Sequence, residues 1–397
     1  MNKHVRAAAY TIAIATLLVG LVVGAGVTWV AKPGPTNVVS KTDFDNLQNS
    51  YNILQNNYNT VNANLAATLA KLAGIQNVKV ALILGTGGLG DKSFNDIAYA
   101  GLQRAQRELN ITFDYASPLA IAEYEGMQTN FAKQEGKYAL IIGIGYDQAD
   151  ALNKTATAYP NQNFAIVDMA VDKPNVASLL FKANEGSFLV GVVSGMMTST
   201  GKAGFVGALD IPLIRDMFVG YQAGVMWANS SATVLSPLFV GGFADPNTAH
   251  EEALSLISQG ADSIYVAAGK SGLGALQAIH EQGKTGFGVD SCQDYLYAEI
   301  KASATKRVDE AVFEMIQAAL LSKLYPNLTE GNFKGGIYNK GLAEGWTGCS
   351  RLPEEEPLWE STFNFTETPL PTNVLTKLTD AQGRIISGNI TVPSGYS

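Results

Sequence analysis

The sequence has few of the residues on which metal, redox and hydrolytic sites depend. Its 397 residues include two cysteines and three histidines. Cys292 and Cys349 are too far apart for a CxxC redox or metal-binding pair, and no metal-ligand spacing or nucleophile-elbow motif occurs. We therefore predict no enzyme, no cofactor and no bound metal. For the two cysteines, a single disulfide and two separate buried thiols both remain open.

Positive charge is also scarce. The 27 Lys and Arg residues face 35 Asp and Glu residues, which gives a formal net charge of -8. Because a nucleic-acid partner requires a basic face that displaces the counterions around phosphate, we predict no nucleic acid among the partners. The chain is long enough, with 47% hydrophobic residues, to bury more than one core, which favours two lobes.

One stretch, residues 7–31, has no charged residue at all. About 20 apolar helical residues cross a bilayer, so this stretch predicts a transmembrane anchor. Lys3 and Arg6 precede it, which places residues 1–6 in the cytoplasm as a short tail and the rest outside the cell membrane, in extracellular or periplasmic space. The alternative is a cleaved secretory signal peptide. No cysteine follows the stretch, which argues against a lipid-modified N-terminus.

Residues 32–75 predict a linker and a coiled-coil stalk. Apolar residues recur there at alternating intervals of three and four, as in a coiled-coil seam. The positions of this seam are Phe44, Leu47, Tyr51, Leu54, Tyr58, Val61, Leu65, Thr68 and Leu72. The alternative is a polar linker, because the segment is rich in Asn, a mediocre helix former. If the helix self-associates, the protein is a homo-oligomer through its stalk.

Residues 76–397 show β-rich runs that alternate with helical stretches, which predicts an α/β domain with parallel sheets. We expect strands at 78–84, 138–143, 164–168, 176–181, 203–209, 234–239, 263–268 and 285–290, and helices at 94–109, 147–157, 185–197, 212–227, 246–259 and 272–282. Runs such as residues 139–142 are apolar on both faces, as doubly wound sheets require. Ligands bind beyond the carboxyl ends of such strands, so polar residues just after them are candidates.

Two glycine-rich motifs suggest nucleotide binding but fit it poorly. Residues 85–90 read GTGGLG and match GxGxxG, yet residues 91–93 separate the motif from the expected helix, and a dinucleotide is an unsuitable ligand outside a cell. Residues 269–271 read GKS, but Ile264 stands where a phosphate loop needs its first glycine. We therefore predict neither site.

A longer set of motifs resembles the basic membrane protein family, the solute receptors of nucleoside-type ABC importers. It begins with GLGDKSFNDIAYAGL at residues 88–102. It continues with IGIGY at 142–146, FAIVD at 164–168, EGSFLVG at 185–191, GFVG at 204–207, FVGYQAG at 218–224, GAD at 260–262, GVD at 288–290 and IISGNITVP at 385–393. The resemblance covers about residues 78–393, so the predicted anchor and stalk lie outside it.

The resemblance implies a type I periplasmic-binding-protein fold, in which two doubly wound parallel-sheet lobes are joined by a hinge. The chain would cross between lobes near residues 180–186, 288–294 and 325–345. It also implies a solute-binding receptor that delivers its ligand to an ABC permease. The ligand would be a purine nucleoside or a similar ring compound such as a flavin.

The resemblance also implies a set of site residues. Phe94 would stack on the base, with Phe218 as first choice and Phe243 as second for a ring from the other lobe. Asp168 would read the base and Asp290 the ribose diol. The further expected ligand contacts are Asp91, Ser93, Asn95, Gly145, Tyr146, Gly269 and Lys306.

Structural roles remain open for these residues. Phe94 is also suited to a core, Asp168 and Asp290 to capping the turns that follow them, and Lys306 to a solvated surface. Two departures from the family pattern bear on the ligand's identity, GGL at residues 87–89 and SCQ at 291–293. Two alternatives to a transport receptor also stay open, a stalked surface protein for sensing or adhesion and an extracellular enzyme.

Overall fold

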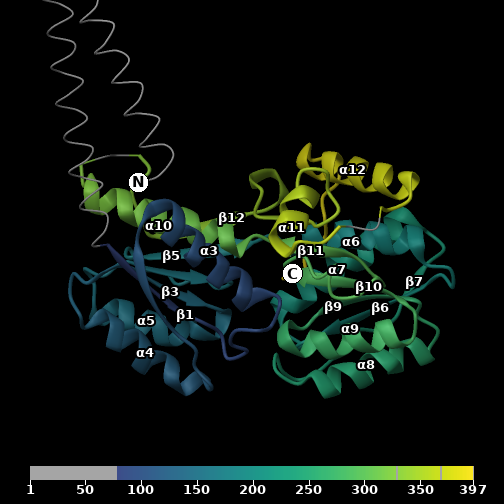
Figure 1. Cartoon of the computed structure of the whole chain (residues 1–397), viewed down its shortest axis with the longest axis horizontal. Coiled ribbons are helices and arrows are strands. Elements are labelled where there is room, and N and C mark those ends of the chain that lie inside the picture. The colour runs from purple at the N-terminus through teal and green to yellow at the C-terminus, as the bar shows by residue number, and fades with distance from the viewer. Residues whose placement is uncertain (1–77, 328–329, 367–368, 397) are drawn as a thin grey trace, which may run out of the picture. The chain divides into compact units, whose positions relative to one another are not determined.

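We describe residues 78–327, 330–366 and 369–396 of a computed structural model. The predicted cytoplasmic tail (1–6), transmembrane anchor (7–31) and linker with stalk (32–75) lie outside these residues. Within the described ranges, no helix has the length and apolar character needed to span a membrane. The two lobes belong to a single compact unit of the chain (Figure 1).

Lobe 1 is built on a six-stranded sheet whose strands all run parallel, in the order β12-β5-β4-β3-β1-β2. Its strands are β1 (Lys79–Ile83), β2 (Thr112–Ala116), β3 (Tyr138–Ile144), β4 (Phe164–Val167), β5 (Val176–Phe181) and β12 (Gly336–Lys340). Its helices are α3 (Phe94–Leu109), α4 (Tyr124–Ala132), α5 (Ala149–Ala158) and α10 (Val308–Leu324), with short 3-10 turns η1 (Ile121–Glu123) and η2 (Tyr146–Gln148).

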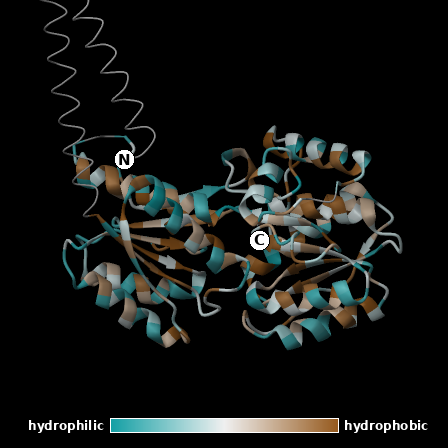
Figure 2. Ribbon diagram, in the orientation of Figure 1, coloured by the Kyte–Doolittle hydropathy of each residue, from teal (hydrophilic) through white to brown (hydrophobic). Residues whose placement is uncertain are grey.

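The apolar strands of lobe 1 are buried on both faces. Along β1, Val80 and Leu82 pack into a core with α3 and α10, whereas Ala81 and Ile83 pack into a second core with α4 and α5. Successive side chains of a strand point to opposite faces, so a strand covered by helices on both sides must be apolar throughout. Figure 2 shows these strands as hydrophobic and the outer faces of the helices as hydrophilic.

Lobe 2 repeats this plan with a seven-stranded sheet in the order β13-β11-β10-β9-β6-β7, in which β8 also pairs with β6 and β13 alone is antiparallel among the described strands. Its strands are β6 (Lys202–Gly207), β7 (Thr233–Val234), β8 (Leu238–Phe239), β9 (Ser263–Ala267), β10 (Thr285–Asp290), β11 (Ile300–Lys306) and β13 (Thr347–Cys349). Helices α6 (Ala183–Met197), α7 (Pro212–Ala228) and α12 (Thr372–Ile386) pack into one core with the sheet, and α8 (Pro246–Ser258) and α9 (Gly272–Glu281) into another. The turns η3 (Gly269–Ser271) and η4 (Leu342–Glu344) and helix α11 (Glu356–Phe363) complete the elements.

The chain passes three times between the sheets: after β5 at Lys182, after β11 at Arg307, and between β12 and β13. The first passage lies within the expected 180–186. The second does not lie at 288–294, because β11 follows β10 and pairs with it in lobe 2, so the chain leaves that lobe only after Lys306. The third falls at the end of the expected 325–345.

Most expected elements form close to their predicted bounds. Helix α3 and strands β5 and β10 begin and end at the predicted residues, whereas the strand expected at 234–239 is divided into β7 and β8. The two cysteines are both buried and form no disulfide with each other. Of the two alternatives for these residues, the structure has separate thiols.

Candidate functional site

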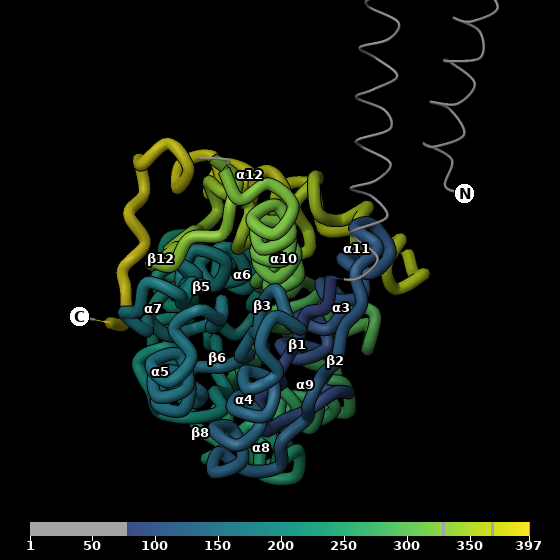
Figure 3. The backbone as a smooth tube through the Cα atoms, turned by 90° about the vertical axis from the view of Figure 1, so that its left-hand side faces the viewer, coloured from purple at the N-terminus to yellow at the C-terminus, as the bar shows by residue number. Residues whose placement is uncertain are grey.

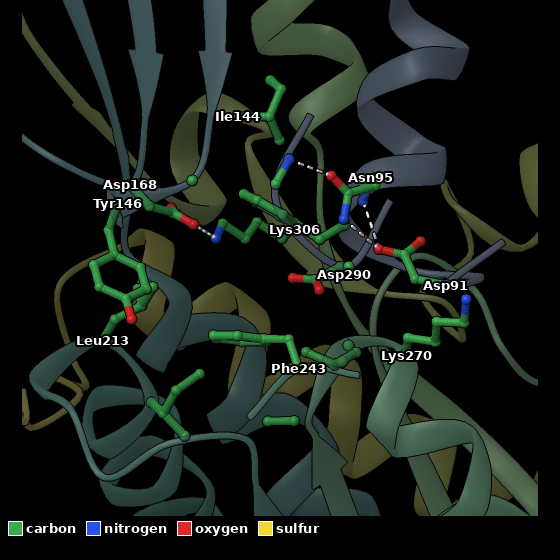
Figure 4. Close-up of a pocket in the computed structure, with 18 of the residues that line it drawn as sticks. Asp91, Asn95, Ile144, Tyr146, Asp168, Leu213, Phe243, Lys270, Asp290 and Lys306 are labelled. Atoms are coloured by element: carbon green, nitrogen blue, oxygen red, sulfur yellow. Dashed lines mark hydrogen bonds and ion pairs between the residues drawn. The ribbon is translucent and has the colours of Figure 1, made fainter. Parts of the chain in front are cut away.

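A cavity lies between the lobes, where the carboxyl ends of strands from both sheets meet. It encloses about 670 Å³, counting space open to solvent. Lobe 1 lines it with Gly85, Thr86, Gly87, Asp91, Phe94, Asn95, Ile144, Gly145, Tyr146, Asp147 and Asp168. Lobe 2 lines it with Leu213, Ile214, Met217, Phe243, Ala267, Gly269, Lys270, Val289, Asp290 and Lys306. Figure 4 shows how side chains from both lobes converge on this space.

The loop between β1 and α3 is held in place by Asp91. One carboxylate oxygen of Asp91 accepts hydrogen bonds from the backbone N–H groups of Ser93 and Asp96, at 3.0 and 3.1 Å. The other accepts from the backbone and side-chain nitrogens of Asn95, at 2.8 and 3.0 Å. Burial nevertheless raises the pKa of Asp91 above its ordinary value. Asp91 thus lines the cavity but caps the start of α3, so its oxygens are already engaged by the chain.

Asn95 is also bound to its own loop. Its side-chain oxygen accepts a hydrogen bond from the Gly85 N–H at 2.8 Å, and its amide donates to Asp91 (Figure 4). One N–H of this amide therefore remains for a ligand. Asp91 and Asn95, which were expected to contact ligand, therefore make most of their hydrogen bonds within this loop.

A buried ion pair joins the lobes across the cavity. The ammonium of Lys306, at the end of β11 in lobe 2, binds one oxygen of Asp168, which follows β4 in lobe 1 (Figure 4). Both side chains are only 4% exposed. The second oxygen, Oδ1 of Asp168, is buried and has no hydrogen-bond partner among the described residues. An acceptor left open in this way is suited to a donor group on a ligand.

Asp290, the last residue of β10 in lobe 2, makes a second contact between the lobes. The Ser93 hydroxyl of lobe 1 donates a hydrogen bond to its carboxylate at 2.6 Å. Burial raises the pKa of Asp290 to about 6, while the nearby positive charge of Lys306 opposes that rise. Ser93 does not itself line the cavity, so it acts on the site through Asp290.

Asp168 and Asp290 share an unusual backbone conformation. Their φ angles are +71° and +64°, in the left-handed region that residues with a side chain rarely adopt. Such strain is retained where the surrounding structure requires it, and it is common at functional sites. The two carboxylates are therefore turned into the cavity by equivalent bends at the ends of β4 and β10.

Aromatic rings approach the cavity from both lobes, but not the pair expected first. Phe94 of lobe 1 lines it and lies under the Lys306 ammonium, which is 4.7 Å from the ring centroid. From lobe 2 the lining ring is Phe243, next to the backbone of Gly269. Phe218, the first choice, instead packs edge-on against Phe205 in the lobe 2 core, at a centroid distance of 5.3 Å. Phe243, the second choice, is therefore the candidate ring of lobe 2 in place of Phe218.

Two glycines give the cavity wall its shape. Gly145 and Gly269 have φ angles of +122° and +54°, which place the chain where a side chain would be strained. A Cβ atom at Gly145 would also lie 2.8 Å from the Asp147 carboxylate. Tyr146, which follows Gly145, lines the cavity as expected from its position after a strand.

Several lining residues were not among the expected contacts. Asp147 also follows β3, so the rule that located Tyr146 was sufficient to find it; its carboxylate accepts a hydrogen bond from Tyr124 at 2.9 Å, and burial raises its pKa. Leu213, Ile214 and Met217 come from the first turns of α7 and carry no polar signal in the sequence. In the described part of the chain, no group of His, Cys, Asp and Glu is arranged to hold a metal ion.

Comparisons with known proteins agree with this geometry. Residues 77–350 match the Bmp family, described as ABC transporter substrate-binding protein PnrA-like. A protein of Pyrococcus horikoshii, described as an uncharacterized lipoprotein, is 33% identical over 288 residues, which cover 69% of each protein. Basic membrane protein A of Borreliella burgdorferi is 32% identical over 286 residues, 70% of this chain and 80% of that protein.

Solved structures extend the similarity to the fold. An ABC transporter solute-binding protein from Aeropyrum pernix matches with a TM-score of 0.67 and 29% identity, over 80% of this chain and 94% of that one. A second, from Conexibacter woesei, matches with a TM-score of 0.62 over 81% of this chain and 100% of that one; at 21% identity it bears on the fold alone. The predicted α/β periplasmic-binding-protein fold is thus confirmed.

The buried ion pair gives a first prediction. Replacing Lys306 by Met leaves the Asp168 carboxylate buried without its cation, so we expect the free energy of unfolding to fall by about 3–5 kcal/mol. The matched control is Lys154→Met, since Lys154 pairs with Glu125 on the surface, where solvent screens the pair and the loss should be much smaller. Urea denaturation measures both, and equal losses would contradict the prediction.

A second prediction concerns pH. Since the pKa of Asp290 is raised to about 6, this group contributes stability when protonated, and that contribution is lost as pH rises from about 4 through 6. In Asp290→Asn the side chain stays neutral, so the stability of the variant relative to the original chain should increase across this interval. Urea denaturation at pH 4, 5, 6 and 7 measures the difference. A constant difference would show that the pKa of Asp290 is not shifted by folding, and a shrinking one that it is lowered; either result would contradict the prediction.

Proposed function

We propose that the cavity binds a purine nucleoside or a similar ring compound. The chain belongs to the Bmp family of PnrA-like ABC transporter substrate-binding proteins. The coarser role follows from the family: the protein is a solute-binding receptor of an ABC transporter, outside the cell or associated with its membrane. The prediction that it is not an enzyme is confirmed on the same ground.

The observation that carries the ligand proposal is the pair of rings from opposite lobes, Phe94 and Phe243, beside an open carboxylate acceptor. A flat heterocycle offers two faces to such rings, and stacking on each contributes about 0.5–1.5 kcal/mol beyond area burial. Oδ1 of Asp168 would accept an N–H of the base. Asp290, positioned by Ser93, would accept hydroxyl groups of a ribose.

The charge of the lining favours a ligand without phosphate. Four carboxyl groups line the cavity, from Asp91, Asp147, Asp168 and Asp290, against two ammonium groups, from Lys270 and Lys306. The Lys306 ammonium already binds Asp168. A phosphate would bring further negative charge into this partly buried space without a free buried cation among the lining residues to meet it.

Delivery to a permease would depend on lobe closure. The hydrogen bonds and ion pair that cross the cleft include Lys306 with Asp168, Ser93 with Asp290 and with the Val289 carbonyl, and the Gln293 amide with the Lys92 carbonyl at 3.2 Å. A ligand that contacts both lobes adds to these bonds and shifts the equilibrium toward the closed form. Hinge bending repositions two rigid lobes, and the permease would distinguish the loaded receptor by that shape.

Attachment to the membrane is proposed from the sequence. The Pyrococcus relative is described as a lipoprotein, whereas both cysteines of this sequence, Cys292 and Cys349, are buried in lobe structure. We therefore retain residues 7–31 as a single-pass anchor and residues 32–75 as a stalk, through which the protein would self-associate as a homo-oligomer. A detergent requirement for extraction, lost when residues 7–31 are removed, would support the anchor.

A third prediction tests the ligand class by calorimetric titration with inosine, guanosine, adenosine and riboflavin. We expect at least one nucleoside to bind and its 5′-monophosphate to bind at least about tenfold more weakly, because of the acidic lining. Binding of none of the four would contradict the nucleoside proposal. Equal binding of the phosphate ester would contradict the role given to the carboxylates.

A fourth prediction separates the two candidate rings of lobe 2. Phe243→Leu removes a ring that faces the cavity and should weaken binding of the selected nucleoside about tenfold. Phe218→Leu is the matched control, because that ring packs against Phe205, and its effect on the dissociation constant should stay below about threefold. The reverse order of effects would restore Phe218 as the stacking residue.

A further inference from the structure

Asp147 lines the cavity from the turn η2, and helix α4 holds its side chain in place. The hydroxyl of Tyr124, a residue of α4 that is 0% exposed, donates a hydrogen bond to Oδ2 of Asp147 at 2.9 Å. Figures 1 and 3 show α4 next to α5 on one face of the lobe 1 sheet, where Tyr124 packs into a shared core. A buried hydroxyl therefore fixes one oxygen of a carboxylate that borders the cavity.

The next residue, Gln148, fixes the backbone of the same turn. Gln148 is fully buried, and its amide donates to three backbone carbonyls at the ends of β1 and β3, at 2.9, 3.0 and 3.2 Å. Its side-chain oxygen accepts from the Gln128 amide at 3.2 Å. Tyr124 and Gln128 are four residues apart on α4, so they lie on one face of that helix. One helix face thus sets both the backbone and the side chain of Asp147.

The second oxygen of Asp147, Oδ1, is open to a ligand. In the described part of the chain it accepts no hydrogen bond from another residue. A Cβ atom built on Gly145 would lie 2.8 Å from this oxygen and 4.0 Å from Cε1 of Phe94. Because Gly145 carries no side chain, the carboxylate and the edge of the stacking ring border the same part of the cavity wall. A heterocycle that stacks on Phe94 therefore has Asp147 beside its edge.

Strand pairing places Asp168 on the same side of the cavity. Strands β3 and β4 are parallel neighbours whose last residues pair with each other, and Gly145 and Asp168 follow those residues directly. Adjacent strands lie about 4.8 Å apart, so the two strand ends bring Asp147 and Asp168 to neighbouring positions. Figure 4 shows Tyr146, the residue before Asp147, beside Asp168. Oδ1 of Asp168 is the buried acceptor that lacks a partner among the described residues.

We propose that Asp147 is a specificity-determining residue for the base: its Oδ1 accepts an exocyclic amino group while Oδ1 of Asp168 accepts the neighbouring ring N–H. Guanine carries these two donors side by side, at N1 and at the 2-amino group, whereas the base of inosine has the ring N–H and a C–H beside it. The site then prefers guanosine to inosine, because inosine brings no donor to Asp147. This role rests on the proposed function, since it names the base that the proposed nucleoside site prefers.

The test compares guanosine with inosine, which differ only in the 2-amino group. By calorimetric titration, we expect guanosine to bind the original chain about tenfold more tightly, as for one hydrogen bond to a charged group. In Asp147→Asn the Tyr124 hydroxyl keeps the amide oxygen, so an N–H faces the ligand amine and the ratio should fall below about twofold. The matched control is Asp150→Asn, which removes the same charge from an exposed position of α5 outside the cavity lining and should keep the ratio.

A second variant changes the position of Asp147 without touching the ligand. Tyr124→Phe keeps the ring in the core and removes the hydroxyl, so the guanosine preference should fall about threefold while the affinity for inosine stays constant. If Asp147 serves only as the hydrogen-bond partner of Tyr124, neither variant changes the ratio, and the inference is overturned. Equal binding of both nucleosides to the original chain also overturns it but leaves the nucleoside proposal standing. Binding of no nucleoside refutes the proposed function and this role with it.

Discussion

The buried ammonium of Lys306 is the charge around which the binding site is organised. Its residue is 3% exposed, and removing an ammonium from water costs several kcal/mol unless other groups compensate. Asp168 supplies the direct ion pair, Asp290 a nearby negative charge, and the ring of Phe94 a cation–π contact. Two of these three compensating groups come from lobe 1, so the charge is fully compensated only when the lobes are together.

The place of Lys306 in the chain couples this charge to the hinge. It is the last residue of β11, and the next residue, Arg307, begins the second passage to lobe 1. A bend at that passage must therefore move the ammonium relative to Asp168. The end of β11 belongs to the lobe 2 sheet and also carries the ammonium group of the site. Opening of the cleft therefore breaks the ion pair.

The sequence was sufficient to predict features that depend on local patterns of residues. Apolar runs predicted the strands, and the positions after them predicted Asp168 and Asp290 as candidates, because strand ends converge in any doubly wound sheet. Phe94 was implied by the family resemblance. It was not sufficient for side-chain direction within an element. Successive residues of a helix differ by about 100°, so Met217, a residue of the lobe 2 core, also lines the cavity, while Phe218, one position later on α7, packs against Phe205 and does not line it.

Tertiary pairing explains the other differences. The second passage was expected too early because the stretch between β10 and β11 contains no helix, so nothing local indicates that the chain returns to the same sheet. Asp91 was expected to contact ligand, but four N–H groups at the start of α3 compete for its oxygens. A carboxylate next to a helix start is more often used by the backbone than by a ligand.

Under the proposed function, the open oxygen of Asp168 would be the site's means of discrimination. A buried acceptor without a partner costs about 1–3 kcal/mol, and that cost is recovered only by a molecule that brings a donor to it. A ring that stacks equally well between Phe94 and Phe243 but lacks an N–H at this point leaves the cost in place. In the proposed site, stacking would therefore set which shapes enter and Asp168 which of them are retained, since a missing hydrogen bond is penalised more strongly than a missing methyl group.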